Sequence, residues 1–369
     1  MKTRLLAGLT ALTLLLTGCS SLLNREYVRI TTHNTTPTAE GDPSVLRAEN
    51  YQELVNALIY FITQGMETGS VRLYIDSETV DADLAAACLE VVQEDPLGAY
   101  AVDYIKYSVN SIVAYYEADV QITYRRTREQ INSIVSATGT TAIRSELESA
   151  LANFSTERVL RISYFDGDED YIRTLCKEAY YADPASALDM PDVSVSIYPD
   201  SGWQRIVEIS LAYHLSTQEL SRRRDLLTLT IEDRVRGLWP MTGDQLILAA
   251  GQSILAAGGY NSEGGSTAYH ALLTGGADSQ GLALAMALAC QNLKISFQVV
   301  AGTLNGNPHF WTVVSTEEGW MHLDLTRLSD WDTPFRTDAQ MTAAGYSWDT
   351  TAIPQCGKPS NDGQTSSGT

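Results

Sequence analysis

Hydrophobic and polar positions divide the chain into a short apolar leader, a polar stretch, a long patterned body and a polar end. Residues 5–16 are almost entirely apolar, whereas residues 20–43 are polar and rich in Thr, Asn and Pro. Segments of helical period and of strict alternation then follow one another from residue 46 to about residue 335. Such periods predict amphipathic helices and half-buried strands, so we expect an α+β body between two tails without a packed core.

An internal repeat is visible within this body when residues 87–96 are placed over residues 175–184, at an offset of 88 residues. Each copy has a helical segment and a strand ahead of this anchor, then two alternating strands and a charged helix after it. The pattern predicts two tandem α+β repeats, at 46–138 and 140–228.

Neither repeat contains a recognisable catalytic set of residues. Cys88 and Cys176 occupy the same repeat position, which favours a shared packing role. Asp95-Pro96 and Asp183-Pro184 each follow a predicted helix. We interpret each pair as a helix stop, because the residue before a proline is pushed out of the α region.

The N-terminus has the order of a secretory signal peptide, with basic residues, the apolar run, and then Leu16-Thr17-Gly18-Cys19. The run is too short to span a bilayer as a permanent helix. The residues ending at Cys19 resemble a bacterial lipobox, and the alternative is an ordinary signal peptide with an incidental cysteine. The resemblance implies that residues 1–18 are removed and that acyl chains on Cys19 anchor the protein to the membrane. We then expect an extracytoplasmic lipoprotein on the bacterial cell surface, with residues 19–45 as a flexible stalk.

Charge and cysteine usage exclude several classes of function. The formal net charge of the whole chain is −20, and acidic residues number 45 against 25 basic ones. Such a surface repels the phosphate backbone, so no nucleic acid partner is expected. The cysteines after Cys19 form no CxxC pair and no close Cys/His cluster, and neither a disulfide framework, a structural metal nor a cofactor is expected.

Three polar residues in the last third of the chain occur where the pattern predicts one helix and two strands. Ser279 precedes the apolar run 282–290, a predicted buried helix, which places its side chain near the positive end of a helix dipole. His309 follows Ser279 by 30 positions, and Asp324 follows His309 by 15. That spacing leaves room for a helix and a strand before His309, and for a hairpin between His309 and Asp324. An imidazole held by a carboxylate beside a hydroxyl is the arrangement of a catalytic triad.

The segment from residue 229 to residue 335 resembles the bacterial transglutaminase-like, or transglutaminase/protease-like, superfamily. The resemblance rests on TAYHALLTGGADSQGLA around Ser279, NPHFW around His309 and WMHLDLT around Asp324. It implies a papain-like α+β domain at 229–335. The polar composition of the last residues separately predicts that the C-terminal extension at 336–369 is largely disordered at its end. It also implies that His309 is the general base, that Asp324 orients it, and that position 279 is the nucleophile. The superfamily carries a cysteine at that position, whereas this chain has serine.

Serine alters the chemistry that this position can perform. A thiol at a helix N-terminus beside an imidazolium ionises, because such surroundings lower cysteine pKa values from about 8.5 to roughly 3.5–7.5. A serine hydroxyl must instead lose its proton during attack, which demands tight alignment with the histidine and an oxyanion hole. We therefore expect that the domain has lost thiol catalysis and binds a polypeptide or peptidoglycan ligand. The alternative is an active Ser-His-Asp hydrolase or acyl transferase acting on peptide or amide bonds at the cell envelope.

Aromatic residues near these positions are the candidate ligand contacts, namely Trp311, Tyr269 and Trp320. For the two tryptophans, packing in the core is the alternative, because strand tryptophans usually pack. A metal site formed by His309, His322 and Asp324 is a weaker alternative for the same strands.

One turn and two other residues receive a prediction of their own. The gap between two helical patterns at residues 262–266 predicts a Gly-rich turn, and His270 is expected on a helix surface. Asp330 is expected in a polar turn after the strand of Asp324, where a solvated turn is the default and a place at the rim of the site is the alternative. His33 and His214 have no partner that the sequence identifies.

Overall fold

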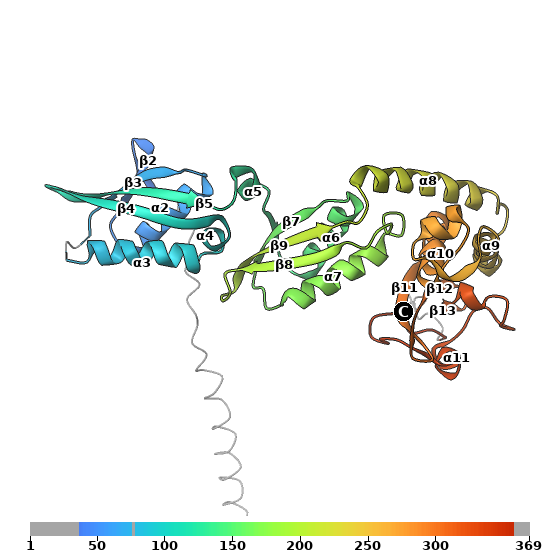
Figure 1. Cartoon of the computed structure of the whole chain (residues 1–369). Helices are drawn as coiled ribbons and strands as arrows, with labels where there is room; N and C mark the ends of the chain where they lie inside the picture. The colour runs from blue at the N-terminus through green and yellow to red at the C-terminus, as the bar shows by residue number, and fades with distance from the viewer. Residues whose placement is uncertain (1–36, 76–77, 358–369) are drawn as a thin grey trace, which may run out of the picture. The chain divides into compact units, whose positions relative to one another are not determined.

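The computed structural model describes residues 37–75 and 78–357, which contain both helices and largely antiparallel sheets (Figure 1). The predicted α+β class is therefore confirmed. The predicted signal peptide, the acylation site Cys19, His33 and the end of the C-terminal extension lie outside the described residues.

The chain divides into two compact units, which are described separately below. Unit 1 contains the described residues up to Cys88 together with Lys106–Gln121. Unit 2 contains Leu89–Ile105 and the described residues from Ile122 onward.

Unit 1 contains most of a five-stranded sheet with the strand order β1-β2-β3-β5-β4. The strands are β1 (Thr38–Glu40), β2 (Asp42–Ala48), β3 (Thr68–Leu73), β4 (Val102–Ile112) and β5 (Tyr115–Tyr124). β2 and β3 are parallel, whereas β3 and β5 are antiparallel. In β5, buried Ala118 and Val120 alternate with exposed Asp119 and Gln121, as expected for a sheet with one solvated face.

Helix α2 (Tyr51–Thr63) packs against β2 and β3. Its N-cap Asn50 accepts a hydrogen bond from the amide of Glu53, which satisfies one free donor of the first turn. The ring of Phe61 lies directly over Gly69, where a Cβ atom would be 2.6 Å from the ring. Glycine in β3 therefore lets the helix approach the sheet closely. Helix α3 (Val80–Gln93) follows in the chain and carries Cys88.

Unit 2 contains a second sheet, with the strand order β6-β7-β9-β8. Its strands are β6 (Val135–Ala137), β7 (Glu157–Ser163), β8 (Asp192–Tyr198) and β9 (Gln204–Ala212). β6 and β7 are parallel, and the other neighbours are antiparallel. The helices α6 (Thr140–Ala152) and α7 (Glu169–Ala182) contact each other and contribute Leu147, Leu175 and Cys176 to the core.

The two Asp-Pro pairs have different roles in the structure. Helix α7 ends at Asp183, its C-cap, as predicted for a helix stop. Asp95 instead begins a new helix, α4 (Pro96–Ala101), because its carboxylate accepts the amides of Leu97 and Gly98. Proline at the first helical position costs no hydrogen bond, so the same dipeptide can begin a helix. A further short helix, α5 (Arg128–Asn132), precedes β6.

The C-terminal part of unit 2 begins with two helices, α8 (Thr217–Arg236) and α9 (Gly243–Leu255). α8 continues without a break through residue 229. Among the described residues, no helix combines the length and the apolar composition needed to cross a membrane.

Helix α10 (Ser279–Leu293) lies at the centre of this part of the molecule. Every residue from Gly281 to Cys290 is buried, because α8 and α9 contact it as well as the strands β11 and β12. A helix that is apolar on all sides is expected only in such a position. Its side chains join those of the second sheet in one continuous core.

A third, antiparallel sheet covers α10, with the strand order β13-β12-β11-β14. Its strands are β11 (Phe297–Leu304), β12 (Asn307–Thr316), β13 (Gly319–Leu323) and β14 (Tyr346–Ser347). Three short helical segments complete the chain, namely η1 (His270–Thr274), η2 (Leu325–Arg327) and α11 (Asp338–Ala343).

The predicted Gly-rich turn is replaced by a short strand, β10 (Tyr260–Gly265). Gly265 pairs with Ala277 in an isolated bridge, and the ring of His270 lies where a Cβ of Gly265 would be. The glycines therefore allow close packing at this point. His270 is the first residue of a short helical segment, as expected, and its ring is partly buried against β10.

Candidate active site

Ser279 is the first residue of α10, at the end of the helix where backbone amides are free to donate. The N-cap is Asp278, whose carboxylate accepts the amide of Gly281 at 2.9 Å and the hydroxyl of Ser266. A Cβ at Gly281 would lie 2.7 Å from the carbonyl oxygen of Gly265. The absence of a side chain there lets the turn before Ser279 pack against β10.

His309 lies near the start of β12, opposite Gly302 of β11, and is 7% exposed. Its Nε2 is 2.7 Å from Oδ2 of Asp324. A carboxylate can only accept, so Nε2 carries the proton. Nδ1 of the neutral ring is therefore unprotonated, and it has no hydrogen-bond partner within the described residues. The ring is thus held in the tautomer of a general base.

Asp324 directly follows β13 and is 1% exposed. Its Oδ1 accepts the amide of Thr326 at 2.8 Å. Its Oδ2 accepts the hydroxyl of Tyr346 at 2.6 Å in addition to Nε2 of His309. Burial and the nearby Asp324 carboxylate raise the pKa of Tyr346, which keeps its hydroxyl protonated and able to donate. Three donors thus stabilise one buried negative charge.

The side chain of Ser279 contacts the backbone of β12, the strand that carries His309. Its Oγ accepts a hydrogen bond of 3.2 Å from the amide of Phe310, the residue next to His309. No hydrogen bond joins this hydroxyl to the imidazole in the part of the chain that the structure describes. The structure therefore brings the three predicted residues to one place, but it joins only His309 and Asp324 directly.

A hollow of about 550 Å³ opens beside His309. It is lined by Tyr260, Leu304, Asn305, Asn307, Pro308, His309, Thr326, Arg327 and Asp330. Most of these side chains are polar, and Arg327 forms an exposed ion pair of 3.1 Å with Asp330. Asp330 is exposed in a turn, as the default expectation had it, and also lines the hollow, whereas Ser279 is not among the lining residues.

The three aromatic residues that were candidate ligand contacts have other surroundings. Trp311 is 1% exposed and stacks on His309, with ring centroids 6.3 Å apart, so it packs in the core. Trp320 is partly buried and packs against the hydrophobic cluster that contains Trp311. Tyr269 is partly buried under the guanidinium of Arg223, which lies 4.9 Å from its ring centre.

His322 belongs to a separate hydrogen-bonded chain and does not converge with His309 and Asp324. The indole Nε1 of Trp311 donates to its Nδ1 at 2.9 Å, and its Nε2 is 2.9 Å from Asp338. Indole nitrogen is a donor only, so Nδ1 must be the acceptor and Nε2 carries the proton. Cys356 lies close to the side chains of His322 and Asp338. A metal ion on Nε2 of His322 would have to displace that proton. With Nδ1 accepting from Trp311 and Nε2 donating to Asp338, the three side chains form a hydrogen-bonded chain.

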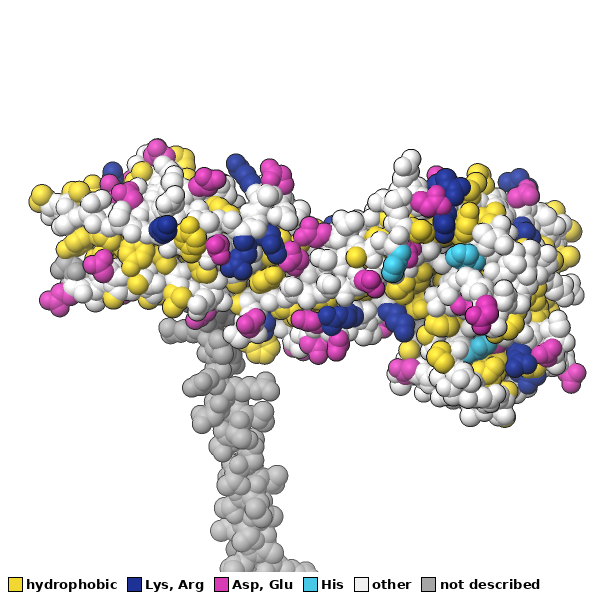
Figure 2. All heavy atoms as spheres, viewed as in Figure 1, with side chains coloured by type: hydrophobic (Ala, Val, Ile, Leu, Met, Phe, Trp, Pro, Cys, Tyr) yellow, Lys and Arg dark blue, Asp and Glu magenta, His cyan; other side chains and the backbone are white. Residues whose placement is uncertain are grey.

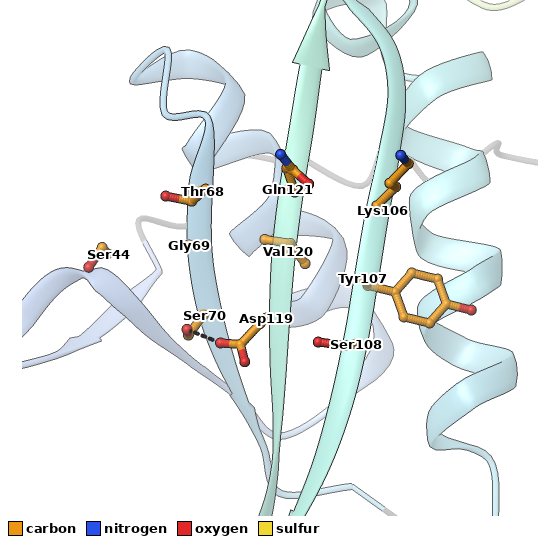
Figure 3. A pocket seen from close by; sticks show the side chains of 10 residues that line it. All are labelled: Ser44, Thr68, Gly69, Ser70, Lys106, Tyr107, Ser108, Asp119, Val120 and Gln121. Carbon is orange, nitrogen blue, oxygen red and sulfur yellow. Dashed lines mark hydrogen bonds between the residues drawn. The ribbon is translucent and has the colours of Figure 1, made fainter.

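A second hollow, of about 500 Å³, lies on the sheet of unit 1 (Figure 3). Its lining includes hydroxyl, amide and charged side chains on β3, β4 and β5, and Ser70 donates to Asp119 at 2.6 Å. Polar side chains with such mutual hydrogen bonds are typical of the solvated face of a sheet. Acidic and basic side chains are mixed over the face shown in Figure 2.

The sequence did not indicate Tyr260, Thr326, Arg327 or Tyr346 as parts of this site. Thr326 and Arg327 lie within three residues of Asp324, which was the available signal for them. Tyr346 follows Asp324 by 22 positions, and no pattern connects the two. His214, for which the sequence identified no partner, is bonded to Asp189 at 3.0 Å.

No protein-family model and no curated protein sequence matches the chain. It is similar to a TGase of solved structure, with 13% identity and a TM-score of 0.28, over 62% of this chain and 67% of that one. It is also similar to a candidate protease from Parabacteroides distasonis, with 7% identity and a TM-score of 0.21. That match covers 71% of this chain and 44% of that one, so it spans less than half of that protein.

His322→Gln should weaken the pH dependence of stability just below pH 6.5. Burial lowers the pKa of His322 from its ordinary 6.5, so the folded protein keeps this ring neutral while the unfolded chain takes up a proton. Stability is then lost as the pH falls from 6.5 toward the folded-state pKa, by at most about 1.4 kcal/mol per pH unit. Urea unfolding at several pH values between about 5.5 and 7 measures the slope for both proteins.

Glutamine retains an oxygen that can accept from Trp311, so the packing is disturbed little. Gln291→Ala, at an exposed position without a titratable side chain, is the control and should keep the slope of the wild type. Identical slopes for wild type and His322→Gln would contradict the prediction.

Proposed function

We propose that the chain is an envelope-anchored lipoprotein whose C-terminal domain is transglutaminase-like and binds a polypeptide or peptidoglycan ligand without thiol chemistry. The hollow beside His309 carries this proposal, because it is lined by His309 but not by position 279. A ligand in this hollow would meet polar side chains suited to amide groups, such as those of Asn305 and Asn307.

The state of Ser279 supports a binding role. Attack by a serine hydroxyl requires that its proton pass to the imidazole, and hence a hydrogen bond between the two groups. The hydroxyl instead accepts from the amide of Phe310. The helix dipole, which favours a thiolate at this position, offers little to a neutral hydroxyl.

A second function, hydrolysis or acyl transfer by Ser279, His309 and Asp324, is favoured by one observation. The buried pair of His309 and Asp324 at 2.7 Å holds the unprotonated Nδ1 that a general base requires. Catalytic hydrogen bonds often tighten only when substrate binds, so a longer separation in the free protein does not exclude a reaction.

We also propose that the two N-terminal sheets are copies of one α+β unit that positions the C-terminal domain or binds a partner. Support comes from their strand orders, β2-β3-β5-β4 and β6-β7-β9-β8, in which corresponding strands follow the same sequence order. The first pair of strands is parallel in each sheet, and Cys88 and Cys176 lie on corresponding helices.

Ser279→Cys should convert the site into one that reacts with a thiol-directed reagent. The four other cysteines of the described chain are buried, and burial raises the pKa of Cys88 to about 11 and of Cys176, Cys290 and Cys356 to about 12. These four cysteines should therefore react slowly with iodoacetamide near pH 7. The experiment uses Cys19→Ser as its background, which removes the N-terminal thiol. We expect labelling of Ser279→Cys to be at least about tenfold faster than this background.

His309→Ala in the same background is the control, and it should abolish the rapid labelling. Rapid labelling that survives His309→Ala would show that position 279 is merely exposed. Slow labelling of Ser279→Cys itself would show that the three positions do not act together.

Binding and catalysis respond differently to Ser279→Ala. If the domain binds its ligand, cosedimentation with peptidoglycan sacculi should survive Ser279→Ala within about twofold. Removing the polar side chains of the hollow, as in Asn305→Ala with Asn307→Ala, should weaken it about tenfold, which corresponds to about 1.4 kcal/mol. Gln291→Ala, on an exposed part of α10, is the matched control.

Release of peptide fragments from the same sacculi measures the second function. Release that disappears in Ser279→Ala would establish catalysis in place of the binding role. If the wild-type protein shows neither cosedimentation with sacculi nor release of fragments, both functions are wrong for this ligand class.

The proposed anchor is tested separately through Cys19. Cys19→Ala should move the protein from the membrane fraction to the soluble fraction of expressing bacterial cells, because one or two acyl chains provide the membrane affinity. Incorporation of labelled palmitate should be lost in parallel. Palmitate incorporation that persists in Cys19→Ala would contradict the anchor.

A further inference from the structure

We propose that Tyr346 regulates this site through its hydroxyl, which withdraws negative charge from Asp324 and so limits how strongly Asp324 stabilises a protonated His309. The proposal rests on the site described above and concerns its regulation. It does not depend on whether the ligand is turned over.

The geometry makes Tyr346 the competitor of His309 for a single oxygen. Oδ2 of Asp324 accepts both from Nε2 of His309 at 2.7 Å and from the hydroxyl of Tyr346 at 2.6 Å. Oδ1 is occupied by the amide of Thr326. A carboxylate that accepts more hydrogen bonds is a weaker base, and it attracts an adjacent imidazolium less strongly.

The orientation of Asp324 does not depend on Tyr346. Asp324 is the N-cap of η2, and its bond to the Thr326 amide fixes the carboxylate plane from the backbone. Loss of the Tyr346 hydroxyl should therefore change the charge on Oδ2 more than its position.

The ring of Tyr346 has a packing role that its hydroxyl does not share. Its centroid lies 5.7 Å from that of His309 and 5.2 Å from that of Trp311. Phenylalanine would preserve both contacts. Tyr346→Phe thus separates the effect of the hydroxyl from the effect of the ring.

Other charged groups act on this pair and must stay unchanged in the comparison. Arg327 on η2 acts on both Asp324 and Tyr346 and partly opposes the rise in the pKa of Tyr346. Asp330 neutralises Arg327 at the rim of the hollow, and Asp278 carries a negative charge beside position 279. None of these residues is altered by the substitutions below.

The first experiment measures iodoacetamide labelling of Ser279→Cys against pH, in the full chain with Cys19→Ser. A thiolate at position 279 forms at lower pH when the neighbouring imidazolium is more stable. Tyr346→Phe should therefore move the onset of labelling down by about 0.5 to 1 pH unit. Well below the onset, labelling should be about three- to tenfold faster. Tyr213→Phe removes a buried hydroxyl that has no hydrogen-bond partner among residues 37–75 and 78–357, and it should leave the onset unchanged.

Replacing Tyr346 by 3-fluorotyrosine should have the opposite effect, because the fluorinated ring is a stronger hydrogen-bond donor of nearly the same size. The onset should then move to higher pH. This variant keeps the hydroxyl, so it also tests the proposal if Tyr346→Phe fails to fold. An unchanged onset in both variants, or shifts of the reverse sign, would overturn the role of Tyr346.

A second measurement is independent of position 279. The proton on Nε2 of His309 should give a downfield proton NMR signal in the wild type that is absent in Asp324→Asn. Tyr346→Phe should move this signal further downfield, and 3-fluorotyrosine should move it upfield, because the strength of the bond follows the basicity of Asp324. If Ser279→Cys labels independently of His309, the proposed site fails while this signal still decides the role of Tyr346. An unmoved signal in both variants contradicts that role even if the labelling is fast.

Discussion

The buried carboxylate of Asp324 is the group on which the arrangement of the site depends. An ionised carboxylate at 1% exposure is tolerated only when donors replace the water that it has lost. Thr326 supplies a backbone donor, while His309 and Tyr346 supply side-chain donors. Satisfying this one charge therefore fixes the end of β13, the tautomer of His309 and the position of β14 together.

Helix α10 connects the site to the rest of unit 2. Its buried face continues the core of the second sheet, and its N-terminus carries Ser279 to the strand of His309. Phe310, whose amide meets Ser279, packs against Tyr181 of α7 with ring centroids 5.8 Å apart. Because interiors are close-packed, a change in α7 can reach position 279 through these contacts.

The polar groups of the third sheet form two separate hydrogen-bonded sets. One contains His309 and Asp324, and the other links Trp311, His322 and Asp338. Trp311 connects the two sets, because its ring stacks on His309 while its indole nitrogen donates to His322. In the proposed transglutaminase-like domain, this tryptophan supports the histidine from within the core and does not contact a ligand.

The sequence by itself determined the elements around Ser279, His309 and Asp324, because local periodicity and spacing specify a buried helix and a hairpin. It also specified the α+β class. Only the tertiary structure decided which groups meet. The bond from Tyr346 to Asp324, the burial of Trp311 and the packing of β10 against the turn before Ser279 arise between segments far apart in the chain. Hydrogen bonds and close packing of this kind depend on the relative placement of whole elements, which no local pattern of residues encodes.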